Sequence, residues 1–296
     1  MHSISTIMKE AYKLHTVIPS FNIPHIPIMT PVVNALKEKD AFGLIAVARL
    51  EWMKFNSKSL EVIAEEYAEC GDEHVTSLHL DHIPVIDEDQ LRVDYMDDIA
   101  RAVGAGYKSV MIDGSRLNLR ENITCVKEVV DYAYGFSIPV EAELGAVIGH
   151  ESGHEMDYEE LFRTGKGFTD TAEAKTFSEE SGVDWLSVAV GSVHGAITGA
   201  AVNQKKVSAI LNIDKLTDLD RELGIPLVLH GGSGIGLTYL KQSFGHGIAK
   251  LNIGTDIRQV FEKGATVKDG QDNVYKRMLE IVDELQIAGT ASKLNG

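Results

Sequence analysis

The chain has 296 residues, of which 44% are hydrophobic and 24% charged, a composition typical of a globular protein with an ample core. Its formal net charge of −16 argues against nucleic acid or an anionic membrane surface as the main partner, although a local metal ion, an arginine or helix N-termini can still attract an anionic substrate. The two cysteines are too few for a disulfide framework. The N-terminal stretch MHSISTIMKEAYKLH lacks the apolar core of a signal peptide. We therefore expect a cytoplasmic protein with reduced thiols.

Short apolar segments with β-forming residues alternate along the chain with longer amphipathic segments. The expected strands are residues 17–22, 43–48, 75–81, 107–113, 138–144, 184–190, 225–230 and 249–254. The expected helices are residues 27–39, 59–70, 95–106, 121–135, 171–182, 212–223 and 238–247. Apolar strands that alternate with helices are typical of a parallel sheet covered by helices.

Eight strands in a chain of this length favour a (β/α)8 TIM barrel. The competing fold is an open doubly wound sheet, which favours a Gly-rich turn after the first strand, and the segment FNIPHIP offers no such turn. No linker or change in composition divides the chain, so we expect residues 1–296 to form a single domain. Two connections, residues 145–168 and 191–209, are unusually long, and long connections are commonly lids or binding loops.

Polar side chains recur where the expected strands end. In a TIM barrel the active site forms at the carboxyl ends of the strands, so residues there meet although they are distant in sequence. The residues in question are Asn22, Asp81, His82, Asp113, Glu143, His194, His230 and Asn252. The sequence therefore predicts a polar site at this end of the barrel.

Three of these residues are histidines on separate strands, His82, His194 and His230. Taken singly, each is more simply interpreted as a hydrogen-bonded structural residue, but three converging imidazoles form a site for a divalent ion, with zinc as the best match. Neutral ligands leave such an ion most of its charge, which suits a Lewis acid that polarises a carbonyl group. Asp81 has the opposite strand parity to His82, so we expect it to act on a substrate proton rather than bind the metal. His79 shares the face of Asp81 and is expected to pack beside the site.

The segment HGGSGI (230–235) predicts a phosphate site. Glycines and a serine that follow a strand expose backbone N–H groups to an anion, although a plain tight turn is the alternative interpretation. The segment LNIGTDIR (251–258) follows the next strand, and the loops after the seventh and eighth strands are the usual phosphate location in TIM barrels.

These motifs resemble those of the class II, metal-dependent fructose-bisphosphate aldolases and their tagatose-bisphosphate relatives. The matching segments run in family order over roughly residues 75–260: LHLDH, SVMIDGS followed by ENI, VEAELG, GVDWLSVAVGSVHGA, IPLVLHGGSGI and KLNIGTDIR. The resemblance implies a lyase that reversibly cleaves a phosphorylated ketose into dihydroxyacetone phosphate and an aldehyde. It also implies a homodimer or homotetramer that acts on a small sugar phosphate, with no nucleic acid or membrane as partner.

The resemblance assigns roles to individual residues. His82, His194 and His230 would bind one catalytic Zn²⁺, which Co²⁺ or Mn²⁺ could replace and a monovalent cation could accompany. Asp81 would exchange the proton of the substrate hydroxyl that becomes the aldehyde, and Glu151 would move the proton at the enediolate carbon. Asp113 and Glu143 match the carboxylates of a second or resting metal position. Contacts to the substrate and its phosphate groups are implied for Asn22, Gly195, Gly231, Ser233, Asn252, Thr255 and Arg258.

The chain departs from the family pattern at the expected rim of the substrate site. Arg49 stands near a position where the family often has serine, and it is either a contact for an anionic part of the substrate or a surface charge. The segment GAITGAAVNQ follows His194 in place of tyrosine and lysine, Gly254 replaces an acid or amide, and His150 precedes Glu151. A different phosphorylated ketose, such as a deoxy or acidic sugar, is therefore the alternative substrate.

Two other classes of protein compete with an aldolase. A metal-dependent hydrolase on the same barrel usually carries an HxH pair on its first strand, and no HxH occurs in this chain. A non-catalytic relative that binds a sugar phosphate is the other alternative, and the presence of Asp81, Glu151 and three candidate ligands argues against it.

Overall fold

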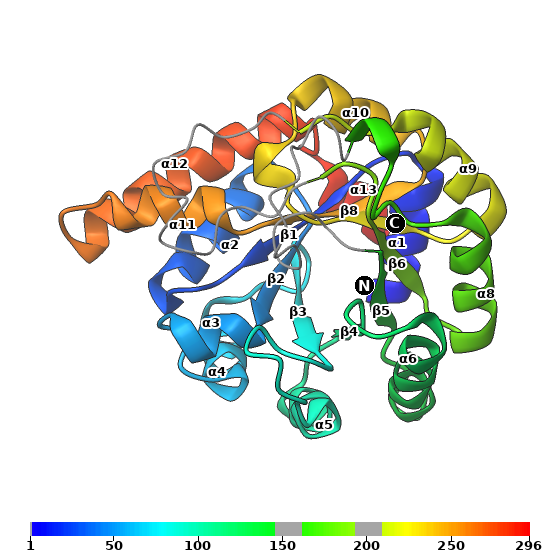
Figure 1. The fold of residues 1–296 in the computed structure, drawn as a ribbon. Helices are drawn as coiled ribbons and strands as arrows, with labels where there is room; N and C mark the ends of the chain where they lie inside the picture. Colours follow the sequence, from blue (N-terminus) through cyan, green and yellow to red (C-terminus); the bar gives the residue numbers. More distant parts are fainter. Residues whose placement is uncertain (1, 146–161, 193–208) are drawn as a thin grey trace.

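The structure, a computed structural model, describes residues 2–145, 162–192 and 209–296, apart from the side chain of Ser233. Its eight parallel strands form a closed barrel in which each strand pairs with the next along the chain and β8 pairs with β1. Figure 1 shows these strands at the centre of the molecule with helices around them. The predicted (β/α)8 TIM barrel is confirmed.

All eight expected strands are present, with small differences at their ends. They are β1 (Ile18–Asn22), β2 (Gly43–Ala48), β3 (Thr76–Pro84), β4 (Ser109–Asp113), β5 (Val140–Leu144), β6 (Trp185–Val188), β7 (Leu227–Leu229) and β8 (Ile248–Ile253). The difference with consequences is in β3, which continues to Pro84 instead of ending at Asp81.

The seven expected helices are also present. They are α2 (Met29–Lys39), α4 (Leu60–Cys70), α5 (Tyr95–Ala105), α6 (Leu119–Tyr134), α8 (Thr171–Ser181), α9 (Ile213–Leu223) and α10 (Leu237–Phe244). Several of these helices begin directly after a residue whose side chain caps the first turn. Ser59, Asn118 and Asn212 each accept a hydrogen bond there from a backbone N–H.

Further helices were not predicted: α1 (Ile4–Lys13), α3 (Arg49–Lys54), α11 (Thr255–Glu262), α12 (Val267–Leu285) and α13 (Thr290–Asn295). In α12, which has 19 residues, the buried Val274, Met278, Ile281 and Leu285 recur at helical spacing, so the sequence carries the signal for this helix. It packs on α2 and α11, on the outside of the barrel wall formed by β1 and β8.

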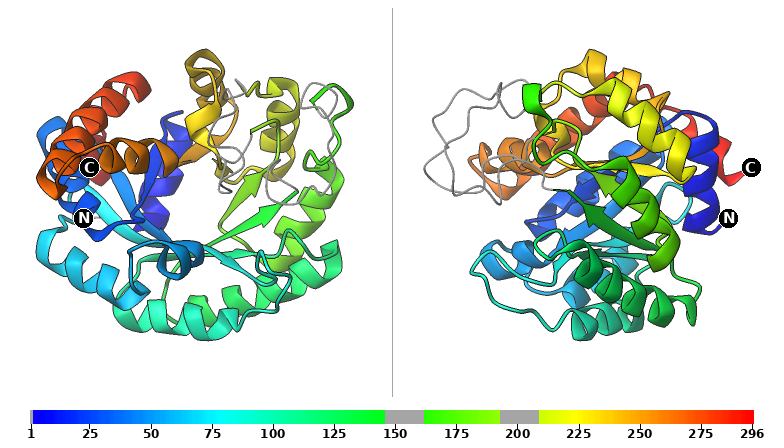
Figure 2. Two further views of the ribbon diagram at one scale, coloured as in Figure 1. Left: turned by 60° about the vertical axis from the view of Figure 1, so that its left-hand side comes forward. Right: turned by 45° about the vertical axis from the view of Figure 1, so that its right-hand side comes forward.

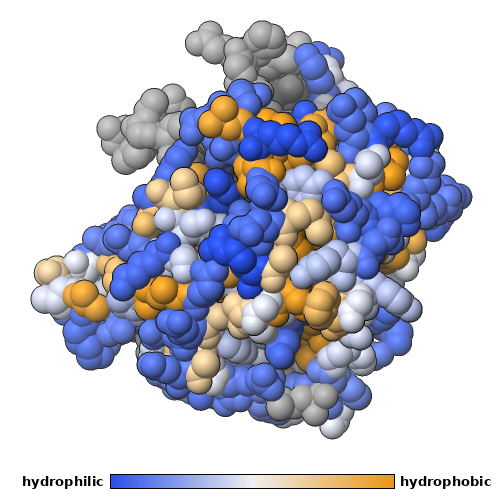
Figure 3. Space-filling view, turned by 90° about the horizontal axis from the view of Figure 1, so that it is seen from below, coloured by the Kyte–Doolittle hydropathy of each residue, from blue (hydrophilic) through white to orange (hydrophobic). Residues whose placement is uncertain are grey.

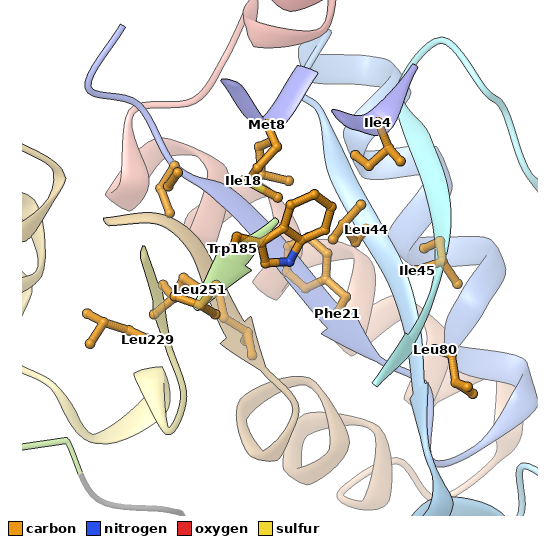
Figure 4. Close-up of a cluster of buried hydrophobic side chains, with 14 of the residues drawn as sticks. Ile4, Met8, Ile18, Phe21, Leu44, Ile45, Leu80, Trp185, Leu229 and Leu251 are labelled. Carbon is orange, nitrogen blue, oxygen red and sulfur yellow. The ribbon is translucent and has the colours of Figure 1, made fainter. Parts of the chain in front are cut away.

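The hydrophobic core lies between the strands and the surrounding helices. Phe21 is fully buried there, and a Cβ atom on Gly43 would lie only 3.0 Å from its ring and 3.2 Å from Leu36 of α2, so glycine allows this close packing. A second part of the core closes the amino end of the barrel. Figure 4 shows Met8 of α1 near Ile18 and Trp185, the first residues of β1 and β6.

The chain begins and ends on the same side of the barrel. Both termini lie at one side of the molecule in the right-hand view of Figure 2, and α1 packs on α13. The amino end of the barrel is therefore covered, and the carboxyl ends of the strands point the other way.

The surface is mostly polar. On the face shown in Figure 3, hydrophilic residues cover most of the area and apolar residues form small patches between them. Within the described ranges, no helix combines the length and the apolar character that crossing a membrane requires.

The packing of Phe21 can be tested by a substitution. We expect Phe21→Ala to lower the free energy of unfolding by about 3–5 kcal/mol, because it removes a ring from a closely packed core. Urea denaturation of the whole chain measures the change. Phe136→Ala removes a ring that is 55% exposed and should leave the free energy within about 0.5 kcal/mol of the wild type. Equal losses in both variants would contradict the packing described here.

Candidate active site

An irregularity in β3 determines how the segment LHLDH faces the barrel. The pairing of β3 with β4 shifts register between Leu80 and Ile83, and His82 has a φ of +39°, in the left-handed region. The shift cancels the alternation of side chains, so Asp81, His82 and His230 place ligand atoms within 4.8 Å of one another. Strand parity therefore does not separate Asp81 from His82 in the structure, and the role of Asp81 as a proton carrier rather than a metal ligand stays a prediction.

The Asp81 carboxylate is buried and surrounded by donors. Asn22 Nδ2 donates to its Oδ2 over 2.8 Å, and Asn252 Nδ2 donates to Oδ1 and Oδ2 over 3.0 and 3.1 Å. The ammonium group of Lys250 lies 3.6 Å from Oδ1. Burial alone would raise the pKa of Asp81, but Lys250 and the neighbouring histidines hold it well below its usual value. The side-chain amides of Asn22 and Asn252 thus fix the position of the Asp81 anion at the carboxyl ends of the strands, which form the mouth of the barrel.

Two predicted metal ligands and two predicted carboxylates come together beside Asp81. The rings of His82 and His230 have centroids 4.3 Å apart. Nδ1 of His82 lies 3.5 Å from Asp113 Oδ2 and 3.9 Å from Glu143 Oε2, and Nδ1 of His230 lies 3.1 Å from the same Glu143 oxygen. These residues come from the carboxyl ends of β3, β4, β5 and β7, so the barrel brings them together as the sequence predicts.

The electrostatics of this group favour a bound cation. Burial alone would lower the pKa of His82, but Asp81, Asp113 and Glu143 raise it to about 10. These three carboxylates therefore stabilise the protonated form of the His82 imidazole, and they would stabilise another cation at the same place for the same reason. A zinc ion is such a cation, and the site offers the nitrogen and oxygen donors that it prefers.

The spacing of the donor atoms agrees with one shared ion. Two atoms that bind a tetrahedral zinc ion at about 2.1 Å lie about 3.4 Å apart. The separations of 3.1 Å between His230 and Glu143 and 3.5 Å between His82 and Asp113 are close to this value. Glu143 Oε2 is buried and accepts no hydrogen bond from the described part of the chain. The residues present therefore fit a metal ion.

A second buried polar layer, which was not predicted, lies beneath the mouth. Glu141 of β5 and Lys250 of β8 are fully buried, and Lys250 Nζ lies 2.8 Å from Glu141 Oε2. His79 belongs to this layer and exchanges a hydrogen bond of 2.8 Å with Ser109 Oγ, in agreement with its expected packing beside the site. The sequence carried a signal for this layer, because alternate residues of a strand face the same side. Glu141 stands two positions before Glu143, and Lys250 stands two positions before Asn252, so both face the barrel interior.

The glycines after β7 allow the chain to turn close to β8. Gly231 directly follows His230 and has a φ of +72°, a conformation that favours glycine. A Cβ atom on Gly232 would lie 2.6 Å from Leu251. Thr255 is the first residue of α11, directly after β8 and Gly254. Both segments therefore lie at the end of the barrel where the sequence predicts phosphate binding, and that binding stays a prediction.

Both predicted arginine contacts have partners within the protein. Arg49 Nε lies 3.4 Å from Asp98 Oδ2 on α5. Arg258 donates to both carboxylate oxygens of Glu262 over 3.1 and 3.0 Å, and its guanidinium lies 5.3 Å from the centre of the Phe55 ring. The anionic group that each arginine meets in the structure is a protein carboxylate, and a role in substrate binding stays a prediction for both.

Some of the predicted residues lie outside the described residues. They are Glu151, His194, Gly195 and the side chain of Ser233. Their predicted roles as proton carrier, third histidine ligand and phosphate contacts remain predictions.

Glu51 is a further acidic residue of the mouth that was not predicted to be part of the site. It is buried in the first turn of α3, and its Oε2 accepts hydrogen bonds from Ala48 N over 2.8 Å and from Asn22 Nδ2 over 3.5 Å. Burial raises the pKa of Glu51 to about 8, and the charge of Asp81 adds to the shift. One asparagine amide thus bridges the Asp81 carboxylate, whose pKa is lowered, and the Glu51 carboxyl group, whose pKa is raised.

The fold and this site together define a TIM barrel with a group of side chains that could hold a metal ion and a buried carboxylate at the carboxyl ends of its strands. The family model described as fructose-bisphosphate aldolase class-II matches residues 2–291. The chain belongs to the class II fructose-bisphosphate aldolase family, as its motifs predict.

Solved structures with the same fold include several aldolases. The chain is 25% identical to the YdjI aldolase from Escherichia coli K12, with a TM-score of 0.76, and the match covers 98% of this chain and 100% of that chain. A putative fructose-1,6-biphosphate aldolase from Coccidioides immitis is 22% identical, with a TM-score of 0.75 and 97% of both chains covered. The fructose-bisphosphate aldolase from Campylobacter jejuni is 18% identical, with a TM-score of 0.72 and coverage of 97% and 95%. The last two support the fold alone.

The raised pKa of Glu51 predicts a pH dependence of stability. The folded chain holds this proton more tightly than the unfolded chain, so the contribution of Glu51 to stability is present below about pH 4.5 and is lost as the pH rises to about 8. Glu51→Gln should therefore be more stable than the wild type by roughly 1–3 kcal/mol at about pH 8, and by much less at about pH 5.

Urea denaturation at a series of pH values measures this difference. The control is Glu65→Gln, which removes an exposed carboxylate on α4 and should leave the difference from the wild type the same at every pH. A Glu51→Gln variant that loses stability relative to the wild type as the pH rises would contradict the assignment.

Proposed function

We propose that this protein is a metal-dependent aldolase that reversibly cleaves a phosphorylated ketose, of the fructose- or tagatose-bisphosphate type, into dihydroxyacetone phosphate and an aldehyde. The observation that carries the proposal is the buried Asp81 carboxylate, fixed by two amides beside His82 and His230. A base next to a metal-binding group is the arrangement that cleavage of a carbon–carbon bond beside a carbonyl requires.

The zinc-binding residues of the proposal are His82, His194 and His230, and Asp113 and Glu143 form a second or resting position. A bound zinc ion supplies the positive charge that polarises the ketone and stabilises the negative charge left after cleavage. Co²⁺ or Mn²⁺ could replace zinc, with a monovalent cation as an additional cofactor.

The proton transfers belong to side chains of the protein. Asp81 accepts the proton of the substrate hydroxyl that becomes the aldehyde, since its carboxylate is an anion with lone pairs available beyond the bonds from Asn22 and Asn252. Glu151 returns a proton to the carbon that loses the aldehyde. Holding Asp81 in one place avoids the entropic cost of orienting a free base for each turnover.

In this proposal Asn22 lines the substrate pocket. The residues that bind the phosphate groups and the triose part of the substrate are Gly195, Gly231, Ser233, Asn252, Thr255 and Arg258. Arg49 remains a candidate contact for an anionic part of the substrate, in exchange for its ion pair with Asp98. The proposal also includes one domain over residues 1–296, a homodimer or homotetramer, and a role in carbohydrate metabolism such as glycolysis in the cytoplasm.

The proposed reaction predicts release of triose phosphate in a coupled assay. We expect at least one member of a panel of phosphorylated ketoses, including tagatose and fructose bisphosphates and deoxy and acidic sugars, to be cleaved. EDTA should abolish the activity, and added zinc, cobalt or manganese should restore it, because the ion supplies the electron sink.

Two outcomes would overturn parts of this proposal. Full activity in the presence of EDTA would exclude the metal-dependent mechanism. A zinc-loaded chain that binds sugar phosphates but cleaves none of them would favour the non-catalytic alternative.

The role of Asp81 predicts separate effects on metal binding and catalysis. Asp81→Ala should retain about one zinc ion per chain, while kcat falls by about 10²–10⁴, the usual range for removal of a general base. Metal analysis and the coupled assay measure the two quantities. Asp89→Ala, which removes an exposed carboxylate, is the control and should leave both unchanged. Loss of zinc from Asp81→Ala would instead make Asp81 a ligand.

A further inference from the structure

Glu141 collects three donors in the interior of the barrel. Lys250 Nζ lies 3.0 Å from its Oε1 and 2.8 Å from its Oε2, Trp185 Nε1 donates to Oε2 over 2.7 Å, and His230 Nε2 lies 3.0 Å from Oε1. All four side chains are almost completely buried. Nothing in the proposed proton transfers or substrate contacts uses Glu141, Trp185 or Lys250.

Stability alone gives a poor account of this arrangement. A buried ion pair loses the hydration of both charges, and apolar residues of similar volume often stabilise a protein as well or better. What the arrangement does provide is a carboxylate with a single position, because donors from β6, from β8 and from the residue directly after β7 converge on a residue of β5. Such a carboxylate can fix the orientation of a neighbouring side chain.

The neighbour whose function depends on orientation is His230. Glu141 is paired with an ammonium group and is therefore an acceptor, so the hydrogen bond of 3.0 Å requires a proton on Nε2 of His230. In the neutral imidazole the lone pair then lies on Nδ1. This nitrogen is on the side of Glu143, 3.1 Å from its Oε2, where His82 also lies.

We propose that Glu141, held in place by Lys250 and Trp185, is a positioning residue that fixes His230 with its proton on Nε2 and presents Nδ1 to the metal ion. The inference rests on the proposed metal-dependent function. Carboxylates that accept the second N–H of a metal-bound histidine set its tautomer and ring orientation. Lys250 also lies 3.6 Å from Asp81, so one buried cation supports both the partner of the ligand and the base.

Zinc affinity of the full chain tests this proposal. Glutamine at position 141 has one acceptor oxygen where the carboxylate has two, so Glu141→Gln leaves Lys250, Trp185 and His230 without enough acceptors. We expect the zinc dissociation constant of Glu141→Gln to rise about 10–100-fold, measured by competition with a chromophoric chelator, while circular dichroism shows a folded chain.

The matched control is Asp184→Asn. Asp184 lies one residue before β6 and accepts a hydrogen bond of 2.8 Å from Val140 N at the start of β5, so its replacement removes a carboxylate from the same pair of strands without a contact to His230. We expect its zinc affinity to equal that of the wild type. An equal loss of affinity in both variants would show a general structural effect and overturn the proposal.

A second measurement needs no change at Glu141. Proton–nitrogen correlation spectra of the zinc-loaded wild type with ¹⁵N-labelled histidine, assigned with His230→Gln, report which ring nitrogen carries hydrogen. We expect hydrogen on Nε2 and metal on Nδ1 of His230. The reverse assignment would overturn the inference even if Glu141→Gln fails to fold.

The outcomes separate this inference from the proposed function. A wild-type chain that binds no zinc would overturn both. Tight zinc binding by the wild type together with unchanged affinity in a folded Glu141→Gln variant would overturn the inference and leave the metal-dependent aldolase intact.

Discussion

Carboxylates can be buried inside a barrel only when donors or cations meet them, and this constraint shapes the centre of the molecule. Burial of an isolated carboxylate is costly enough to drive it to the neutral form. Asp81 and Glu141 avoid that outcome because Lys250 stands between them and because the amides of Asn22 and Asn252 donate to Asp81. The interior of a TIM barrel is usually filled by layers of branched apolar side chains, so a polar interior marks the end where chemistry takes place.

The two polar layers have different consequences. In the lower layer, around Glu141, the charges balance within the protein, since Lys250 compensates the carboxylate and holds the pKa of Glu141 near 2 despite its burial. In the upper layer, Asp113 and Glu143 face His82, and no lysine or arginine of the described part of the chain forms an ion pair with either carboxylate. An excess of negative charge at a concave site recruits either protons or a metal ion. The upper layer is therefore where an ion fits, and the lower layer is the support beneath it.

The β-bulge at His82 links the backbone to this chemistry. A regular strand would send Asp81 and His82 to opposite faces, and one of them would point into the helical layer. The register shift and the left-handed backbone at His82 turn both toward the same group. Backbone conformations of this kind cost free energy and persist where the surroundings enforce them, often at functional sites. Here the surroundings are His230, Asp113 and Glu143.

The sequence by itself determined the barrel, because eight apolar segments alternating with amphipathic ones leave few other folds, and it determined which strand ends carry His82, Asp113, Glu143 and His230. These features are local or depend on order along the chain. Only the tertiary structure decided the orientation of Asp81, the partners of Arg49 and Arg258, and the buried layer of Glu141 and Lys250. The physical reason is that parity and spacing say only which face of an ideal strand a residue occupies. The closed packing of the whole chain decides where a strand has a bulge, which helices form an ion pair, and which side chains of β5 and β8 meet inside the barrel.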